Sequence, residues 1–234
     1  MNILALGAHP DDIEGLGGGT LLKYKAQGGK IFIALTTSGN IGSNLHEVRE
    51  EIAAIREQEQ LEAAKMYDAQ VRFLRYDDEG LQDTLETRRA VLNAMRWAEP
   101  DVIFTHFPGD PSTDHAVTSK LVSEMILSLP AKLVPADEPP VEKKPSVFFW
   151  DTAAGIDFLP EVYVDISEVI DQKIEALAKH KSQYAWMGVF ERDNLSDFCR
   201  TLAKFRGSQA GYRYAEGFRA FRIHAYMPNF RLLP

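Results

Sequence analysis

The sequence predicts an α/β fold, namely a Rossmann-like, three-layer, doubly wound and mainly parallel sheet. Two observations lead to this prediction. Short apolar, β-branched runs alternate with longer segments of helical periodicity, as where Ile31–Thr37 is followed by 47–67. In addition, the first and fourth apolar runs end in polar residues, as buried strands that feed loops do. Repeated β-α units of this kind imply a parallel sheet with right-handed crossovers.

The first half of the chain supplies four strand and helix pairs. The helix at 20–27 stops at Gly28, and the helix at 84–98 ends before Pro100. The long helix at 47–67 places its apolar residues near one face among many charges. We expect strands at 2–8, 31–37, 71–74 and 102–106, and helices at 20–27, 47–67, 84–98 and 116–129.

The second half of the chain begins with a break in this pattern. Residues 130–145 contain five prolines and mixed charges, which predicts an extended surface loop. This loop is either a tolerated insertion or a lid that covers a substrate. Strands are expected again at 146–151 and 162–166, and helices at 167–180 and 195–205. An aromatic and arginine-rich segment follows the last helix.

Composition excludes several classes of protein. With 234 residues, 45% hydrophobic and 26% charged, the chain is expected to form one α/β domain over residues 1–234. A net charge of −8 argues against a nucleic-acid partner. The single cysteine, Cys199, excludes an internal disulfide and is compatible with a reducing cytoplasm. No apolar run approaches the roughly 18–20 residues of a membrane span. The sequence is compatible with a homo-oligomer.

The stretch after the first strand groups one imidazole with three carboxylates. His9, Asp11, Asp12 and Glu14 lie within six residues, and such a grouping is repulsive unless a cation neutralises it. A divalent metal at the carboxyl ends of the strands is therefore expected, because ligands bind there in open α/β sheets. Two roles are open for Glu14. It either supports the loop or a metal ligand through a hydrogen bond, or it is an ordinary carboxylate at the start of a helix.

The polar loop after the fourth strand supplies the second half of the expected site. It opens on the same edge of the sheet, so His115 can complete a set with His9 and Asp12. Two imidazoles and one carboxylate are a catalytic zinc ligand set, and Asp11 is then left free as a general base. Taken alone, Asp114 and His115 would indicate only the capped N-terminus of a helix.

These residues carry a resemblance to a known family. The segment from Ala8 to Gly15 resembles the signature of the LmbE-like, or PIG-L, family of zinc-dependent N-deacetylases. That family includes the glucosaminyl-phosphatidylinositol de-N-acetylases and the deacetylases of mycothiol and bacillithiol synthesis. Further similar motifs follow in the family's order, at Arg56-Glu57-Gln58-Glu59, Asp110–His115, Asp165-Ile166-Ser167 with Lys173, His180 and Gln183, and Ala215-Glu216-Gly217-Phe218.

The resemblance implies a site and a reaction. It implies His9, Asp12 and His115 as ligands of Zn²⁺ or another divalent metal, and Asp11 as the general base. The implied reaction is attack of metal-bound water on the acetamide of an N-acetylglucosamine-type conjugate. Arg56 matches a family arginine near the site, where it contacts the substrate or a carboxylate.

One position departs from the family pattern. Many members have a histidine three residues before the last ligand, and this chain has Ser112 there. The metal, Ser112, a backbone N–H or His106 is left to stabilise the oxyanion. His106 is otherwise a satisfied histidine beneath the loop.

Other polar residues carry open alternatives. Asp77-Asp78-Glu79 follows a strand and either contacts substrate or forms a solvated loop. For His180 and Gln183, helix packing and hydrogen bonding are favoured over chemistry. Two other functions are left open. One is a metal-dependent hydratase or lyase of a small unsaturated acid, and the other is a non-catalytic metal or sugar binder.

Overall fold

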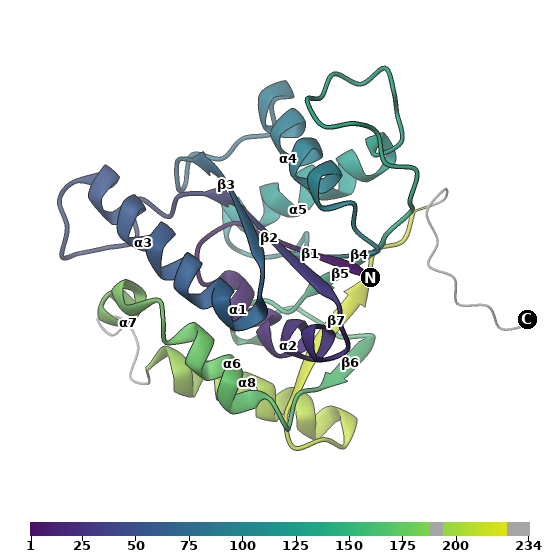
Figure 1. Cartoon of the computed structure of the whole chain (residues 1–234). Helices are drawn as coiled ribbons and strands as arrows, with labels where there is room; N and C mark the ends of the chain where they lie inside the picture. Colours follow the sequence, from purple (N-terminus) through teal and green to yellow (C-terminus); the bar gives the residue numbers. More distant parts are fainter. Residues whose placement is uncertain (188–193, 224–234) are drawn as a thin grey trace, which may run out of the picture.

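The computed structural model describes residues 1–187 and 194–223. Within them, seven strands form one sheet in the order β3-β2-β1-β4-β5-β7-β6 (Figure 1). Strands β1 to β5 are parallel to one another, and β7 is antiparallel to both β5 and β6. The strands are β1 (Asn2–Gly7), β2 (Lys30–Thr37), β3 (Gln70–Tyr76), β4 (Val102–Thr105), β5 (Ser146–Trp150), β6 (Val162–Asp165) and β7 (Ala215–Ala220).

Helices cover both faces of this sheet, which confirms the predicted three-layer, mainly parallel α/β architecture. On one face, α4 and α5 pack against Leu4 and Leu6 of β1. On the other face, α1, α2 and α6 pack against Ile3 and Ala5 of the same strand. The α-helices are α1 (Asp12–Leu16), α2 (Gly18–Ala26), α3 (Arg49–Ala64), α4 (Leu85–Ala98), α5 (Thr113–Met125), α6 (Ile170–Leu177), α7 (Lys181–Met187) and α8 (Leu195–Ala210).

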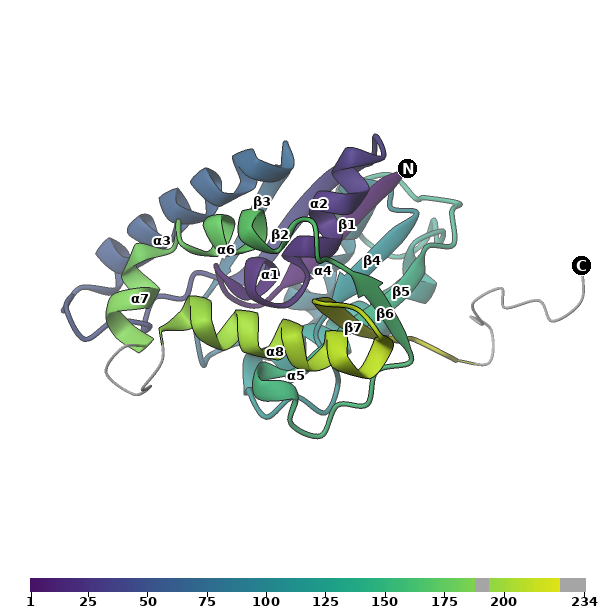
Figure 2. The same cartoon turned by 90° about the horizontal axis from the view of Figure 1, so that it is seen from below.

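The alternation of side chains along β1 explains the two cores. Successive residues of a strand point to opposite faces, and every residue from Ile3 to Leu6 is apolar and fully buried. Short 3₁₀ turns at Lys65–Tyr67, Ile126–Ser128 and Ala153–Gly155 extend or connect the elements. At the far edge of the sheet, α8 lies beside β6 and β7 (Figure 2), where Arg206 forms a buried ion pair with Asp151 at 2.6 Å.

Three expectations about these elements were wrong. The first helix is expected only at 20–27, but the chain is already helical from Asp12 in α1 and from Gly18 in α2. Helix α5 begins at Thr113, three residues earlier than expected, because Ser112 opens it in an extended conformation. The C-terminal segment contains β7, an antiparallel strand that the aromatic and arginine-rich pattern did not indicate.

The proline-rich segment 130–145 packs on the α4 side of the molecule. Arg96 donates to the carbonyls of Ser128, Ala131 and Glu138, and Val141 is buried. None of its residues, all of which the structure describes, lines the cavity described below, so the lid alternative is not supported. Among the described helices, none combines the length and the apolar character needed to cross a membrane.

Candidate metal centre and active site

The sheet order brings two loops together. From β1 the sheet extends through β2 and β3 on one side and through β4 and β5 on the other. β1 and β4 are parallel neighbours, with Leu6 opposite Thr105. Such a reversal is a topological switch point, where ligands bind outside the carboxyl ends of the strands. His9 and Asp12 follow β1, and His115 lies in the first turn of α5 after β4.

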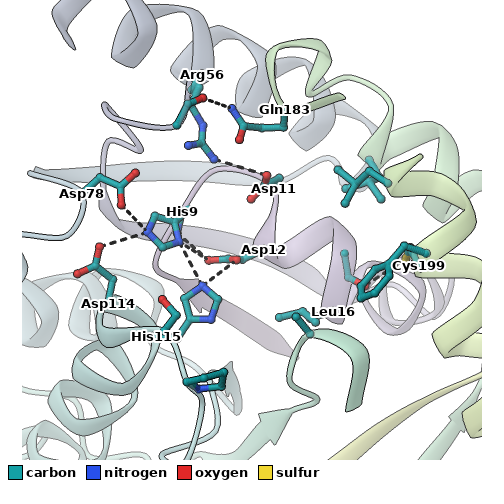
Figure 3. A pocket seen from close by; sticks show the side chains of 18 of the residues that line it. His9, Asp11, Asp12, Leu16, Arg56, Asp78, Asp114, His115, Gln183 and Cys199 are labelled. Carbon is teal, nitrogen blue, oxygen red and sulfur yellow. Dashed lines mark hydrogen bonds and ion pairs between the residues drawn. The ribbon is translucent and has the colours of Figure 1, made fainter. Parts of the chain in front are cut away.

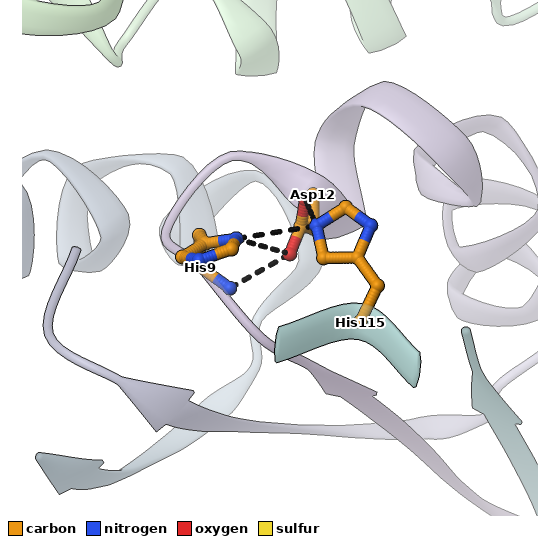
Figure 4. Close-up of side chains that lie close together, drawn as sticks. All are labelled: His9, Asp12 and His115. Atoms are coloured by element: carbon orange, nitrogen blue, oxygen red, sulfur yellow. Dashed lines mark hydrogen bonds and ion pairs between the residues drawn. The ribbon is translucent and has the colours of Figure 1, made fainter. Parts of the chain in front are cut away.

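His9, Asp12 and His115 point toward one another from these loops (Figure 4). His9 Nδ1 and His115 Nε2 lie 3.2 Å apart, and His115 Nε2 lies 3.2 Å from Asp12 Oδ1. Asp12 Oδ2 lies 3.5 Å from His9 Nδ1. Tetrahedral ligands held about 2.0–2.2 Å from zinc lie about 3.3–3.5 Å from one another. The donor types and their spacing therefore fit a divalent ion such as zinc.

One carboxylate oxygen of Asp12 accepts hydrogen bonds from the protein itself. Asp12 Oδ2 accepts hydrogen bonds from the backbone N–H groups of Ala8 at 3.2 Å and His9 at 2.7 Å. The same oxygen lies 3.2 Å from His106 Nε2. These donors fix the carboxylate, so that Oδ1 faces His115 and is free to bind a cation.

Trp150 determines which nitrogen of His106 carries the proton. Trp150 Nε1 lies 3.1 Å from His106 Nδ1, and an indole N–H can only donate, so Nδ1 accepts. The proton therefore sits on Nε2 and points to Asp12 Oδ2. The N–H of Ala8 points both at Nε2, at 2.9 Å, and at Asp12 Oδ2, at 3.2 Å. Because an N–H can only donate, Asp12 Oδ2 is the acceptor beside Nε2 that can take the histidine proton. Burial, together with nearby His115, lowers the pKa of His106 to about 4, so the ring is neutral at pH 7.

Carboxylates also lie close to the outer nitrogens of the two other histidines. His9 Nε2 lies 3.0 Å from Asp78 Oδ1 and 3.2 Å from Asp114 Oδ2. His115 Nδ1 lies 3.1 Å from Asp110 Oδ1. A carboxylate behind an imidazole orients the ring and makes the facing nitrogen a better metal ligand. Both rings are therefore oriented with one nitrogen toward Asp12.

The same carboxylates make the site attractive to a cation. Burial lowers the pKa of His9, but three surrounding carboxylates outweigh burial and raise it well above its usual value. Burial also lowers the pKa of His115, yet Asp12 and Asp110 raise it to about 9. The rings sit in a strongly negative surrounding, where a metal ion competes with protons for the same nitrogens.

Asp11 borders the same cavity in an unusual backbone conformation. Its φ is 114°, in a region that L-residues rarely adopt, and such strain is concentrated at functional sites. Arg56 Nη2 lies 3.5 Å from Asp11 Oδ2. Burial raises the pKa of Asp11 and Arg56 lowers it, with a raised pKa as the result. Asp11 is thus a carboxylate that holds a proton more readily than an exposed aspartate.

The three residues expected at the substrate or the oxyanion differ in their positions. Arg56 lines the cavity, is buried, and donates to the carbonyls of Pro10 at 2.6 Å and Gly39 at 3.0 Å. Ser112 also lines the cavity, and its N–H donates to Asp110 Oδ1 at 2.9 Å. His106 does not line the cavity and is fully buried. Of the two roles left open for His106, this position favours a satisfied histidine beneath the loop, because both of its nitrogens face protein groups.

The cavity has a volume of about 850 Å³ and is open between the two loops and α8 (Figure 3). Such a volume is in the range of about 300–1,000 Å³ that is typical of small-molecule sites. Its polar lining is contributed by His9, Asp11, Asp12, Arg56, Asp78, Glu79, Ser112, Thr113, Asp114, His115 and Gln183. Its other lining residues are Gly15, Leu16, Ile41, Gly42, Pro111, Ala153, Leu177, Leu195, Phe198, Cys199 and Leu202.

Sequence reasoning missed the carboxylates around the histidines. The sequence indicates Asp114 only as a helix cap, and Asp78 only as a substrate contact or a solvated residue. Asp78, Asp114 and His9 form a convergent group of their own, as do His106, Asp110 and His115. The position of Asp78 in the sequence could have indicated this role. Asp78 follows β3, so it lies at the same edge of the sheet as the two loops.

Glu14 is a residue of α1, and its side chain is fully buried. Glu14 Oε2 lies 3.1 Å from His180 Nε2, and Gln60 Nε2 donates to Glu14 Oε1 at 3.0 Å. Gln183 Nε2 donates to the Gly42 carbonyl at 3.0 Å. His180 thus serves hydrogen bonding, as favoured from the sequence, and Gln183 does so at the cavity wall.

Comparisons with known proteins identify the family and the fold. The model of the PIG-L family, described as GlcNAc-PI de-N-acetylase, matches residues 4–126. The chain is 28% identical over 228 residues to the diacetylchitobiose deacetylase of Thermococcus kodakarensis, covering 93% of this chain and 82% of that protein. The solved N,N'-diacetylchitobiose deacetylase from Pyrococcus horikoshii superimposes with a TM-score of 0.81 at 27% identity, covering 94% of this chain and 83% of the other.

The same fold also occurs with a different activity. The 4-carboxy-2-hydroxymuconate hydratase from Pseudomonas putida superimposes with a TM-score of 0.82 at 21% identity, covering 99% of this chain and 100% of the other. At that identity the likeness shows the fold alone.

Proposed function

Since this chain belongs to the PIG-L family of GlcNAc-PI de-N-acetylases, we propose that it hydrolyses the acetamide of an N-acetylglucosamine-type sugar or conjugate. The observation that carries the proposal is the convergence of His9, Asp12 and His115 beside Asp11 in one cavity. The similarity to two diacetylchitobiose deacetylases supports the substrate class.

We assign His9, Asp12 and His115 as the residues that hold zinc. A zinc ion held there supplies Lewis acidity, which polarises a carbonyl and lowers the pKa of water. Two observations fit this assignment. Asp12 Oδ2 has buried hydrogen-bond donors, and carboxylates lie beside the outer nitrogens of both imidazoles. Neighbouring groups that orient metal ligands in this way increase the affinity for the metal.

Asp11 is assigned as the general base. In hydrolysis the attacking water loses a proton while the carbonyl carbon is attacked, and the leaving amine later gains one. The Asp11 carboxylate takes the first proton and returns it to the amine. Its raised pKa suits both steps, since a carboxylate that is too acidic is a poor base. Arg56, 3.5 Å from Oδ2, keeps the carboxylate ionised before the water arrives.

Ser112 is assigned to the substrate, whereas Arg56 is the partner of the Asp11 carboxylate. The backbone N–H of Ser112 is already donated to Asp110, so only its hydroxyl is left to meet the oxyanion in place of the family histidine. A hydroxyl is a weaker donor than an imidazolium. Loss of one good oxyanion donor costs about 2.7–4 kcal/mol, so we expect a slower enzyme than relatives that keep the histidine.

The test is the release of two products in equal amounts. Zinc-loaded protein is incubated with N-acetylglucosamine, its glycosides and N,N'-diacetylchitobiose, and both free amine and acetate are measured. Equimolar amine and acetate are expected. Absence of acetate with zinc bound would contradict the proposal, and water addition to a small unsaturated acid would indicate the hydratase instead.

A further inference from the structure

The cavity has two chemically different ends. Asp78 and Asp114 lie on one side of His9, whereas Leu16 and Cys199 lie on the opposite side, beyond Asp12 (Figure 3). Asp11 lies between these two ends in the same view. A scissile amide placed at Asp11 therefore has a carboxylate-rich space on one side and an apolar space on the other.

The apolar end is formed mainly by one face of α8. We call it the apolar arm, and its residues are Leu16, Leu177, Leu195, Phe198, Cys199 and Leu202. The four residues from α8 have the spacing i, i+3, i+4 and i+7, which places them in one stripe of a helix. Leu195, Phe198 and Leu202 are only half-buried, so the stripe leaves apolar surface in the cavity.

The floor of the apolar arm is open at Gly15. A Cβ atom at Gly15 would meet no atom within 4 Å, although Gly15 lies inside α1, three residues after Asp12. The cavity of about 850 Å³ is larger than an acetyl group and one sugar ring fill. Apolar surface facing such a space favours an apolar ligand, because its burial removes that surface from water.

We propose that the apolar arm binds the acyl group of the substrate, and that the enzyme removes N-acyl groups longer than acetyl. This inference rests on the proposed function. An amide joins an amine part to an acyl part, so a sugar amide at Asp11 presents hydroxyls on one side and carbon on the other. The hydroxyls match the polar end, where Asp78 and the exposed Glu79 line the cavity, and the acyl chain then enters the apolar arm. Water adds to the acyl carbon as the C–N bond breaks, giving a carboxylate and a free amine.

The test is a series of glucosamines that carry acetyl, butanoyl, hexanoyl or octanoyl groups, with octyl glycosides of N-acetylglucosamine as a second series. We expect kcat/KM to rise along the acyl series, by up to about fourfold for each methylene that becomes buried. A flat or falling acyl series overturns the inference while leaving the proposed deacetylase intact. A rise confined to the octyl glycosides overturns it as well, since the apolar arm would then hold the aglycone.

Two variants and a control locate the effect. Gly15→Leu fills the apolar arm and Leu202→Ala removes part of its wall, so both are expected to lower the ratio of octanoyl to acetyl kcat/KM about tenfold. Phe205→Ala, an exposed residue of the same helix, should leave that ratio unchanged. An unchanged ratio in both cavity variants contradicts the assignment.

A binding measurement decides the inference even if no amide is cleaved. Calorimetric titration of N-octanoyl- and N-acetylglucosamine into the zinc-loaded protein should show tighter binding of the octanoyl compound, and Gly15→Leu should remove the difference. Equal affinities would overturn the inference independently of turnover.

Discussion

At the scale of single residues, the indole N–H of Trp150 determines which nitrogen of His106 carries the proton. That proton points to Asp12 Oδ2 and helps to fix the orientation of the carboxylate. Trp150 and His106 are both fully buried, and a buried indole without an acceptor would cost about 1–3 kcal/mol. The observed arrangement satisfies Trp150, His106 and both backbone N–H groups at Asp12 Oδ2 together. Asp12 therefore presents one defined oxygen to the space between His9 and His115.

Replacing Trp150 with phenylalanine should loosen this arrangement. Without the indole donor, the His106 proton can move to Nδ1, and Asp12 Oδ2 loses one of its donors. We expect zinc affinity to fall about tenfold, as for other groups behind metal ligands. Long-range ¹H–¹⁵N spectra should show protonated Nε2 in the parent protein and a mixture of tautomers in the variant.

Trp97→Phe is the matched control, because Trp97 packs on Phe32 in the other core. It should change neither the spectrum of His106 nor zinc affinity. A parent protein with the proton on Nδ1, or a Trp150→Phe variant with unaltered zinc affinity, would refute the role given to this pair.

At the scale of elements, α1 is held from behind by a buried polar network. Glu14 of α1 meets Gln60 of α3 and His180, which precedes α7. His180 and Glu14 are fully buried, so each depends on the other for charge compensation. The network fixes the helix whose first residue is Asp12. It thereby links α3 and the α6–α7 connection to the candidate site.

The same pair makes stability depend on pH. Burial lowers the pKa of His180, but Glu14 outweighs burial and the result is a raised pKa. A raised folded-state pKa gives stability that is fully present below about pH 6.5 and is lost as pH rises through the folded-state value. His180→Leu should cost about 3–5 kcal/mol at pH 6 and less at pH 9.

Urea unfolding at fixed zinc concentration measures this difference. Lys179→Ala, which removes only a surface pair with Glu175, should cost less than about 1 kcal/mol at both pH values. A His180→Leu cost that grows from pH 6 to pH 9 would show that the sign is wrong.

Element boundaries explain what the sequence could and could not predict. The buried strands β1, β2 and β4 were predictable, because their apolar runs are continuous and end in polar residues. Gly15 hid helix α1, and Gly17 and Gly18 hid the start of α2, because glycine is a poor helix former. Trp150 and Tyr67 lie close to Gly17 and Gly18, which leaves little room for a side chain at either position. Strand β7 was hidden because its sequence, with Glu216, Gly217 and Arg219, lacks alternation.

At the scale of the whole molecule, the sheet topology assembles the site. The meeting of the first and fourth loops was predictable from the order of β-α units. The side-chain network around the histidines was not, because Trp150 lies on β5 and Asp78 follows β3. Contacts between residues so far apart in the sequence leave no local pattern. The departure at Ser112 could be recognised only by comparison with the family pattern, because a serine before a helix is common in any protein.

Because the expected ligands come from distant parts of the chain, zinc should stabilise the entire fold. At a free zinc concentration about 1,000-fold above Kd, binding adds about 4 kcal/mol to the free energy of unfolding. Thermal unfolding with and without a chelator should show this difference in the parent protein and in His46→Ala. His115→Ala should show almost none, and a full zinc effect in His115→Ala would contradict the ligand assignment.

The most direct test of the central claim compares the parent protein with Asp11→Asn. Zinc content is measured by mass spectrometry, and amine release from N,N'-diacetylchitobiose is measured on the same samples. We predict one zinc per chain in both proteins and a loss of about 10²–10⁴-fold in kcat for the variant, the usual contribution of a general base. Undiminished turnover in Asp11→Asn with zinc in place would contradict the assignment of Asp11 as the base, and loss of zinc would place Asp11 among the ligands instead.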